Sequence, residues 1–317
     1  MIIQTMYRVV AGIDVHKKQV TCTVIKESLE GALSKVSKEF LTFRNELKKM
    51  GEWFKNEGVE LSVMESTGVF WKSVYETLED FEIPTFVVNA RHVKTVPGRK
   101  TDVMDSEWLA ELGRAGLLRA SFIPPRDLRE LRLITRYRRK LIQMKAAEKN
   151  RLHKILDDAG VRLGCVVSDI DGVSARSMIE ALIENKIRPD EIANLAIGRL
   201  KKKREDILLS LDGRLSDRHR FLLRQIQFHI KKLDEQISSI DALVVEAMAP
   251  YCKEWQLFET IPGIDKIGAA MLLAEIGIEM NHFASKEKLS SWAGMCSGNN
   301  ESAGKKKRAK HGKRTSI

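Results

Sequence analysis

The stretch YRVVAGIDVHKKQVTCTVIK, residues 7–26, decides the expected fold. Runs rich in β-branched residues stand on either side of the polar group at 16–18, a pattern typical of two antiparallel strands joined by a short turn. A third strand is predicted at 38–43. The following segments alternate: a helix at 45–55, a strand at 60–65, a helix at 69–80, a strand at 84–89 and a helix at 102–115. This order predicts an α/β domain with a mixed sheet, ending near Pro124-Pro125.

Beyond this break the sequence becomes helical and basic. At 126–158 apolar residues recur at helical spacing while arginine and lysine fill the other faces, which predicts one long basic helix. Residues 160–200 fit short helices and loops. From about 205 to 249 apolar residues recur in steps of mostly three and four, as in a coiled-coil seam.

The segment at 257–277 predicts a tight hairpin of two helices. Pro262-Gly263 supplies the turn, and small residues begin an apolar helix whose free N–H groups could meet a phosphate. Such a unit resembles a helix-hairpin-helix motif, which contacts nucleic-acid backbones. A plain packing corner between two helices is the alternative.

Composition and charge limit the class of protein. The 317 residues are 43% hydrophobic, enough to form a core, and carry a net charge of +11, which indicates a polyanionic partner. Residues 1–125 hold 17 basic and 17 acidic residues, so the surplus lies beyond them. Neither a long apolar run nor a secretory signal is present, so we expect a cytoplasmic protein without a membrane partner. The four cysteines are widely spaced, which argues against disulfides and structural zinc.

Basic residues in two places are expected to bind nucleic acid. Residues 302–317 hold seven basic residues and no acid. The residues assigned to binding are Lys305, Lys306, Lys307, Arg308 and Lys310 in this tail, and Arg136, Arg139 and Lys140 on the long helix.

Four carboxylates mark a candidate metal site in the α/β domain. Asp14 and Glu65 each end an apolar strand, where burial without a partner would cost several kcal/mol. Asp102 and Asp105 are three apart at a helix start and so share one face. Taken alone, Asp102 could be an N-cap and Glu65 a surface acid. Together the four suit oxygen ligation of Mg²⁺ for phosphoryl transfer.

A serine near the basic tail is the candidate nucleophile. Ser302 stands between an Asn-Asn-Glu loop and a lysine run, where cations could hold a phosphodiester and stabilise developing charge. A helix-capping role is the alternative. Cys296, the rival nucleophile, lacks adjacent cations and fits a small core residue.

The motifs together resemble the insertion-sequence 110 family of DEDD transposases, in the family's order and over nearly the whole chain. They are GIDVHKK at 12–18, MESTGVFW at 64–71, VNARHVKTVPGRKTDVMDSEWLAEL at 88–112, IPGIDKIGAAMLLAEIG at 261–277 and WAGMCSGNNESAGK at 292–305. The resemblance implies three domains: an RNase H-like, RuvC-like domain at 1–125, a helical coiled-coil region at 126–250 and a transposase domain at 251–317.

The resemblance also implies a mechanism and partners. The family's DEDD acids fall on Asp14, Glu65, Asp102 and Asp105, which would bind Mg²⁺, and its serine falls on Ser302, which would form a covalent phosphoserine link to DNA. Family members are guided by a structured bridge RNA that pairs with donor and target DNA. They act as homo-oligomers, here expected to be a dimer to tetramer.

The sequence departs from the family pattern in two places, and two other functions stay open. Ser297 stands where the family often has proline, and family members continue past residue 317, so the domain at 251–317 is expected to be truncated. A RuvC-type junction nuclease would use metal-activated water and leave Ser302 inert. A truncated, non-catalytic relic would bind nucleic acid in a salt-sensitive way without cutting it.

Overall fold

The computed structural model describes residues 6–66, 68–89, 93 and 105–295, and the backbone alone of 301–302 and 305–306. The chain forms two compact units. The first, here the N-terminal unit, comprises Met1–Ile123 and Met280–Ile317; the second, the helical unit, comprises Pro124–Glu279. The unit boundary thus falls beside Pro124-Pro125, while the division into three domains stays a prediction.

A five-stranded mixed sheet forms the centre of the N-terminal unit. The strands are β1 (Val9–Val15), β2 (Gln19–Glu27), β3 (Leu33–Leu41), β4 (Leu61–Glu65) and β5 (Thr85–Val88), in the spatial order β3-β2-β1-β4-β5. The first three pair antiparallel, and β4 pairs parallel with both β1 and β5. This order and direction are those of the RNase H-like fold. The predicted α/β domain with a mixed sheet is confirmed.

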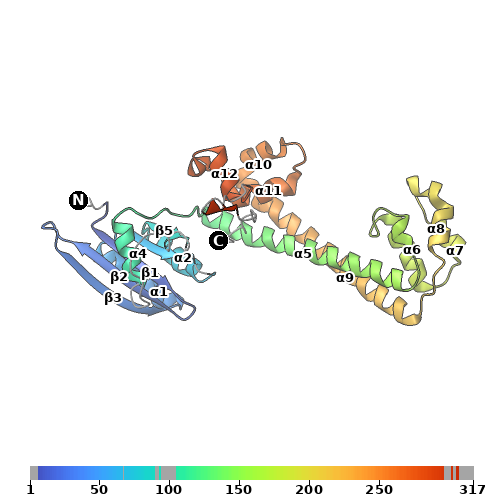
Figure 1. Cartoon of the computed structure of the whole chain (residues 1–317), viewed down its shortest axis with the longest axis horizontal. Coiled ribbons are helices and arrows are strands. Elements are labelled where there is room, and N and C mark those ends of the chain that lie inside the picture. Colours follow the sequence, from blue (N-terminus) through green and yellow to red (C-terminus); the bar gives the residue numbers. More distant parts are fainter. Residues whose placement is uncertain are drawn as a thin grey trace. The chain divides into compact units, whose positions relative to one another are not determined.

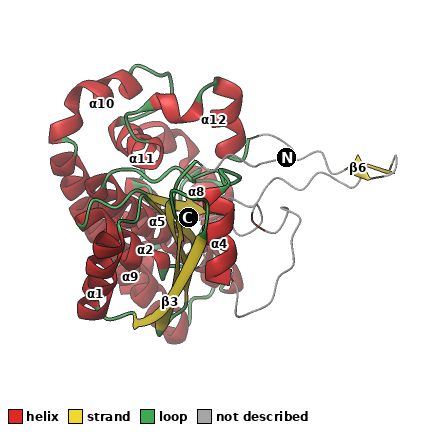
Figure 2. Ribbon diagram, turned by 90° about the vertical axis from the view of Figure 1, so that its left-hand side faces the viewer, coloured by secondary structure: helices red, strands yellow, loops and turns green. Residues whose placement is uncertain are grey.

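Helices cover both faces of this sheet (Figure 2). On one face, α1 (Arg44–Glu57) and α2 (Trp71–Asp80) pack against side chains such as Ile13 and Met64. On the other face, α4 (Asp105–Arg114) packs against Val10 and Val63. Since alternate residues of a strand point to opposite faces, β1 and β4 contribute to both cores.

The helical unit is built on two long antiparallel helices, α5 (Arg126–Asp158) and α9 (Asp217–Ala247), which run side by side (Figure 1). Early residues of α5 pair with late residues of α9, as Arg138 does with Asp241, and later ones with earlier, as Glu148 does with His229.

Short elements cover both ends of this helix pair. At one end η2 (Leu163–Cys165), α6 (Val173–Glu184), α7 (Pro189–Ala193), η3 (Gly198–Lys203) and α8 (Arg204–Ser210) enclose a core that includes Leu156 and Ile207. At the other end η4 (Ala249–Tyr251), α10 (Cys252–Glu259) and α11 (Lys266–Ile276) pack on Leu128 and Val244.

The second long helix begins later than the sequence predicted. Residues 204–210 form α8, the chain then leaves the helix, and α9 starts at Asp217. Ser216 caps α9, because its hydroxyl accepts the N–H of His219. Gly213 lies so close to the end of α5 that a Cβ there would come 2.6 Å from the carbonyl oxygen of Ala159. The helical spacing expected from about residue 205 is therefore interrupted, and the long helix itself starts at Asp217.

After residue 279 the chain rejoins the N-terminal unit. It forms η5 (Met280–Phe283), α12 (Lys286–Trp292) and the paired strands β6 (Glu301–Ser302) and β7 (Lys305–Lys306). Phe122 packs against Phe283 and Trp292, with ring centroids 5.5 and 6.5 Å away. Within the described residues no helix is long and apolar enough to span a membrane.

Candidate active site

Two of the predicted carboxylates lie at the ends of neighbouring parallel strands. Ile13 of β1 pairs with Met64 of β4, so the next residue on each strand, Asp14 and Glu65, lies at the same edge of the sheet. Both carboxylates are half-buried. By alternation they belong to the face that carries Val10 and Val63, which α4 covers. The sheet therefore brings the two acids together at one end and on one face.

The third carboxylate comes to this face through a close helix–strand contact. Asp105 is the first residue of α4, and the next residue, Ser106, lies directly over Gly12 of β1. A Cβ on Gly12 would come 1.8 Å from the carbonyl oxygen of Ser106, so only glycine permits this approach. The Ser106 hydroxyl also hydrogen-bonds that of Thr23, at 2.8 Å, which fixes the position of α4 along the sheet. The half-buried Asp105 thus belongs to the same side and end of the sheet as Asp14.

A histidine that sequence reasoning treated as a turn residue contacts this site. The Nε2 atom of His16 lies 2.9 Å from Oδ2 of Asp14. The sequence feature that could have identified His16 is its position two residues after Asp14, directly after β1 ends. On the opposite face burial raises the pKa of Cys22, and the Asp14 charge raises it further, so this thiol stays protonated and is not a competing ligand.

The structure describes three of the four predicted acids, namely Asp14, Glu65 and Asp105. Asp102 lies outside the described residues. Among the residues that the structure does describe, no three Asp, Glu, His or Cys side chains are placed to hold a metal ion. The chemistry of Asp14, Glu65 and Asp105 nevertheless fits a hard divalent cation, which prefers carboxylate oxygens. Their side chains as described do not form a metal site by themselves, so the ligand set stays a prediction.

The candidate nucleophile lies in a short β-hairpin of the N-terminal unit. The backbone of Ser302 pairs antiparallel with Lys305, and Glu301 pairs with Lys306. This pairing places lysine backbone opposite the serine, while the side chains there are not described. Three predicted binding residues, Lys307, Arg308 and Lys310, and the rival Cys296 lie outside the described residues.

The predicted binding residues of α5 differ from one another in their contacts. Arg136 forms two hydrogen bonds of 2.9 Å with the carboxylate of Glu275, which raise the pKa of its guanidinium. This pair joins α5 to α11, so much of the charge of Arg136 is neutralised within the protein. Arg139 and Lys140 are exposed and available to a ligand.

The hairpin of α10 and α11 is present, but the start of α11 is already capped. Gly263 turns the chain with a φ of 86°, and Trp255 donates its indole N–H to the carbonyl of Lys266 at 2.8 Å. The carboxylate of Asp265 accepts the N–H of Gly268 at 2.6 Å. The expectation that these N–H groups are free for a phosphate is therefore wrong at Gly268.

Two models of transposase families match the chain. That of the DEDD transposases of the IS110 elements matches residues 11–160, and one described as Transposase IS116/IS110/IS902 family matches residues 255–316. No curated protein matches. Two solved structures, "Thermus thermophilus RuvC structure" and "T. thermophilus RuvC in complex with Holliday junction substrate", each align with 36% of this chain and 99% of their own, at 14% identity and a TM-score of 0.28.

The two family models agree with each other and with the fold. The first covers the sheet that carries Asp14 and Glu65 and continues through α5. The second covers the α10–α11 hairpin and the Ser302 segment. Together they span about two thirds of the sequence, and transposases are enzymes that cleave and recombine DNA. The chain belongs to the insertion-sequence 110 family of DEDD transposases.

Proposed function

We propose that this transposase cuts and rejoins DNA through a phosphoserine intermediate at Ser302, assisted by Mg²⁺ held by Asp14, Glu65, Asp102 and Asp105. The observation that carries the proposal is the placement of three carboxylates, Asp14, Glu65 and Asp105, at one end and one face of the sheet. DEDD enzymes of this fold generally use divalent metal ions, and Mg²⁺ bound here would neutralise charge that develops on a phosphodiester.

In the proposed reaction, each bond that forms is matched by a bond that breaks. The hydroxyl oxygen of Ser302 attacks phosphorus, a new P–O bond forms, and the bond from phosphorus to one deoxyribose oxygen breaks. The proton lost by the serine is balanced by the proton gained by the leaving hydroxyl group. Attack by a hydroxyl of another strand reverses the step, so strands are exchanged without a net loss of phosphodiester bonds. Lys305 and Lys306 pair through their backbones with Ser302 and Glu301, and lysine cations beside the serine would help to hold a phosphodiester.

The proposal also includes a guide RNA and a homo-oligomeric assembly. A structured bridge RNA would pair with donor and target DNA and supply the sequence choice, while the protein contacts backbones. The net charge of +11 supports such a sequence-independent grip. The active assembly would be a homo-oligomer, a dimer to tetramer, of chains divided at about residues 125 and 250.

A covalent-adduct assay tests this function. The full chain is incubated with Mg²⁺, its element-end RNA and labelled donor and target DNA, and the products are separated on a denaturing gel. We expect a protein–DNA adduct that Ser302→Ala removes. We expect Asp102→Asn to abolish metal-dependent strand exchange and leave RNA binding nearly intact, because the basic residues remain.

Each other outcome rejects part of the proposal. Free cut ends without an adduct indicate a metal-dependent junction nuclease in which Ser302 is inert. An adduct that persists in Ser302→Ala places the nucleophile elsewhere. Strand exchange that survives Asp102→Asn rejects the assignment of the acids, and nucleic-acid binding without any cutting indicates a binding protein.

A further inference from the structure

The helical unit carries a dense cluster of positive charge that neither the sequence motifs nor the proposed site uses. Residues 199–204, Arg-Leu-Lys-Lys-Lys-Arg, here called the basic turn, hold five cations and no acid. They form η3 and the first residue of α8, and all five cations are exposed. Within the described part of the chain, none of the five forms an ion pair with a carboxylate.

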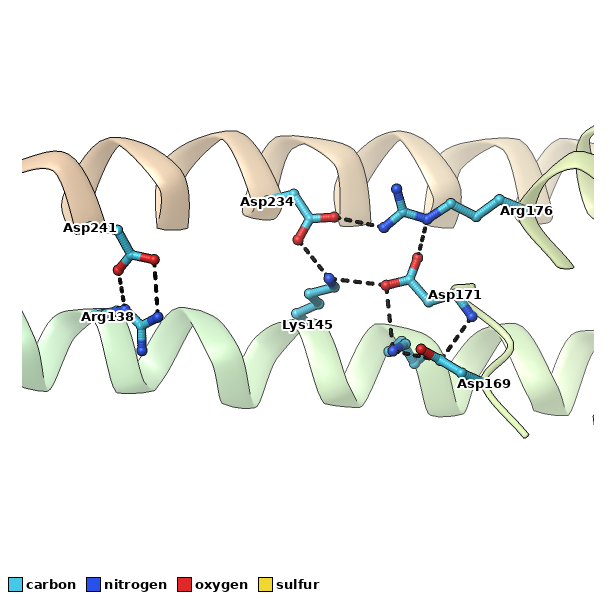
Figure 3. A network of polar contacts seen from close by, with 8 residues as sticks. Arg138, Lys145, Asp169, Asp171, Arg176, Asp234 and Asp241 are labelled. Carbon is cyan, nitrogen blue, oxygen red and sulfur yellow. Dashed lines mark hydrogen bonds and ion pairs between the residues drawn. The ribbon is translucent and has the colours of Figure 1, made fainter. Parts of the chain in front are cut away.

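Several other cations of this unit form ion pairs within it, in contrast to the five of the basic turn. Arg136 binds Glu275, and Arg138 binds Asp241. Lys145 forms ion pairs with both Asp234 and Asp171 (Figure 3), at 2.6 and 3.0 Å respectively. These paired cations join elements of the helical unit, whereas the basic turn, like Arg139 and Lys140 of α5, presents its cations to solvent.

The basic turn is held by its neighbours in the fold. Leu200 packs against the core around Ile207, which is fully buried. The guanidinium of Arg204 donates from Nε to the side-chain oxygen of Asn194 at 2.7 Å, and Lys203 donates from Nζ to the carbonyl of Val166 at 3.5 Å. Charges on a fixed backbone lose less conformational freedom when a ligand binds.

Three cations of the turn remain for a ligand. Within the described residues no polar contact of Arg199, Lys201 or Lys202 with another side chain is present. Two acids, Glu205 and Asp206, follow the turn in the first helical turn of α8, where the helix dipole favours negative charge.

We propose that the basic turn binds the phosphate backbone of duplex DNA. Residues 189–210 contain no aromatic residue, so the surface has no platform on which unpaired bases could stack. Lysines act as point charges for phosphates, and contacts with phosphate oxygens carry no information about base sequence. DNA is the polyanion on which this family of enzymes acts, which favours a DNA duplex over an RNA duplex.

Two exposed aliphatic residues near the basic turn raise an anionic membrane as the alternative ligand. Ile197 and Leu209 are 53% and 76% exposed, and a basic surface with apolar residues could also meet an anionic membrane. Residues 189–210 lack the aromatic residues that membrane-binding faces typically contain. Binding to vesicles therefore serves as an outcome that would overturn the proposal.

The inference adds a DNA contact to the proposed function without needing the serine or the metal. It is tested in the presence of a metal chelator, so that no strand is cut. Fluorescence anisotropy measures binding of the full chain to a labelled DNA duplex at several salt concentrations. Failure of the phosphoserine mechanism would leave this result unchanged.

The test compares two variants that lose the same charge. Arg199→Gln/Lys201→Gln/Lys202→Gln removes three cations from the basic turn. The matched control, Lys49→Gln/Lys186→Gln/Lys232→Gln, removes three lysines that already pair with Glu46, Glu184 and Glu235. The first variant should bind DNA more weakly, with a log–log salt slope shallower by about 2.7, or 0.9 for each lost phosphate contact. The control should keep the wild-type slope.

Several results would overturn the proposal. Equal weakening by both variants would attribute the effect to net charge alone. Wild-type DNA binding by the first variant would exclude the basic turn, and a loss confined to an RNA duplex or to vesicles of anionic lipid would assign a different ligand. Thermal melting by circular dichroism establishes that each variant is folded. Lys201→Glu/Lys202→Glu provides a second variant, which should weaken DNA binding further.

Discussion

At the scale of single residues, Asp171 shows how a buried charge is stabilised. Its side chain is 6% exposed, and it lies 2.6 Å from Nε of Arg176 and 3.0 Å from Nζ of Lys145. Burial alone would raise its pKa, but hydrogen bonds from Arg176 and Lys145 lower it to about 2. The same cations reach Asp234 of α9, so this network joins α5, α6 and α9 (Figure 3).

We expect Asp171→Asn to lower the free energy of unfolding by about 2 kcal/mol at neutral pH. Because the folded protein holds this proton less tightly than the unfolded chain, the stabilisation is complete above pH 3.8, the ordinary pKa, and is lost as the pH falls toward 2. Urea unfolding followed by helical circular dichroism at several pH values measures the difference. The difference in the free energy of unfolding between the variant and the wild type should become smaller as the pH falls toward 2.

The matched control is Asp169→Asn. Asp169 contacts Lys149 of the same network, but its side chain is 58% exposed, so its removal should cost much less. A gap for Asp171→Asn that stays constant between pH 5 and 2 would contradict the role of its charge and indicate a packing effect.

Sequence reasoning placed the site residues by their local pattern and missed partners far along the chain. An acid at the end of an apolar strand has a visible signature, so the strand-end positions of Asp14 and Glu65 could be predicted. Arg136 looks like any exposed cation of a basic helix, because its partner Glu275 is 139 residues away. Asp102 stays a predicted ligand, and Ser302 stays a predicted nucleophile.

At the scale of elements, the site depends on how closely α4 approaches β1. Gly12→Ala would place a Cβ 1.8 Å from the carbonyl oxygen of Ser106 and 2.6 Å from the amide nitrogen of Ala110. Backbone atoms cannot yield as a flexible side chain does, so α4 must shift and carry Asp105 with it. We expect a loss of stability of about 1–3 kcal/mol and a loss of DNA cleavage. Urea unfolding and the adduct assay measure the two effects.

A glycine in an open turn provides the control for this variant. Gly31 has a φ of 83°, and a Cβ added there would have no atom within 4 Å. Gly31→Ala should therefore cost about 1 kcal/mol through backbone strain and leave cleavage intact. Wild-type stability and cleavage in Gly12→Ala would show that the close contact of α4 with β1 is not needed.

The elements themselves were predictable to different degrees. The strands around residues 7–26 and the helix at 126–158 have strong periodicity, and the structure confirms them as β1, β2 and α5. The start of α9 was missed because the apolar spacing continues through 205–215, although Gly213 and Ser216 mark the interruption. The apolar spacing reflects which residues are buried in the same core. It does not show that the backbone leaves the helix between α8 and α9.

At the scale of the whole molecule, the candidate metal ligands and the cations of the basic turn have separate proposed roles. Asp14, Glu65 and Asp105 belong to the sheet of the N-terminal unit, whereas the basic turn belongs to the helical unit. Carboxylates that hold a divalent cation confer metal dependence, and cations that contact phosphates confer salt dependence. The two dependences should therefore be separable in one protein.

Removal of divalent metal should abolish strand cleavage while duplex binding and fold persist. Chelation leaves the carboxylates without the cation that would neutralise charge on the phosphodiester, but it leaves the lysines and arginines unchanged. Cleavage, anisotropy and circular dichroism are measured on the same sample with chelator, and again after excess Mg²⁺ is added, which should restore cleavage. Raised salt provides the converse control, because it should weaken binding steeply at constant Mg²⁺. Cleavage that continues in chelator would refute a metal-dependent role for the acids, and binding that disappears with the metal would show that the metal itself links protein to DNA.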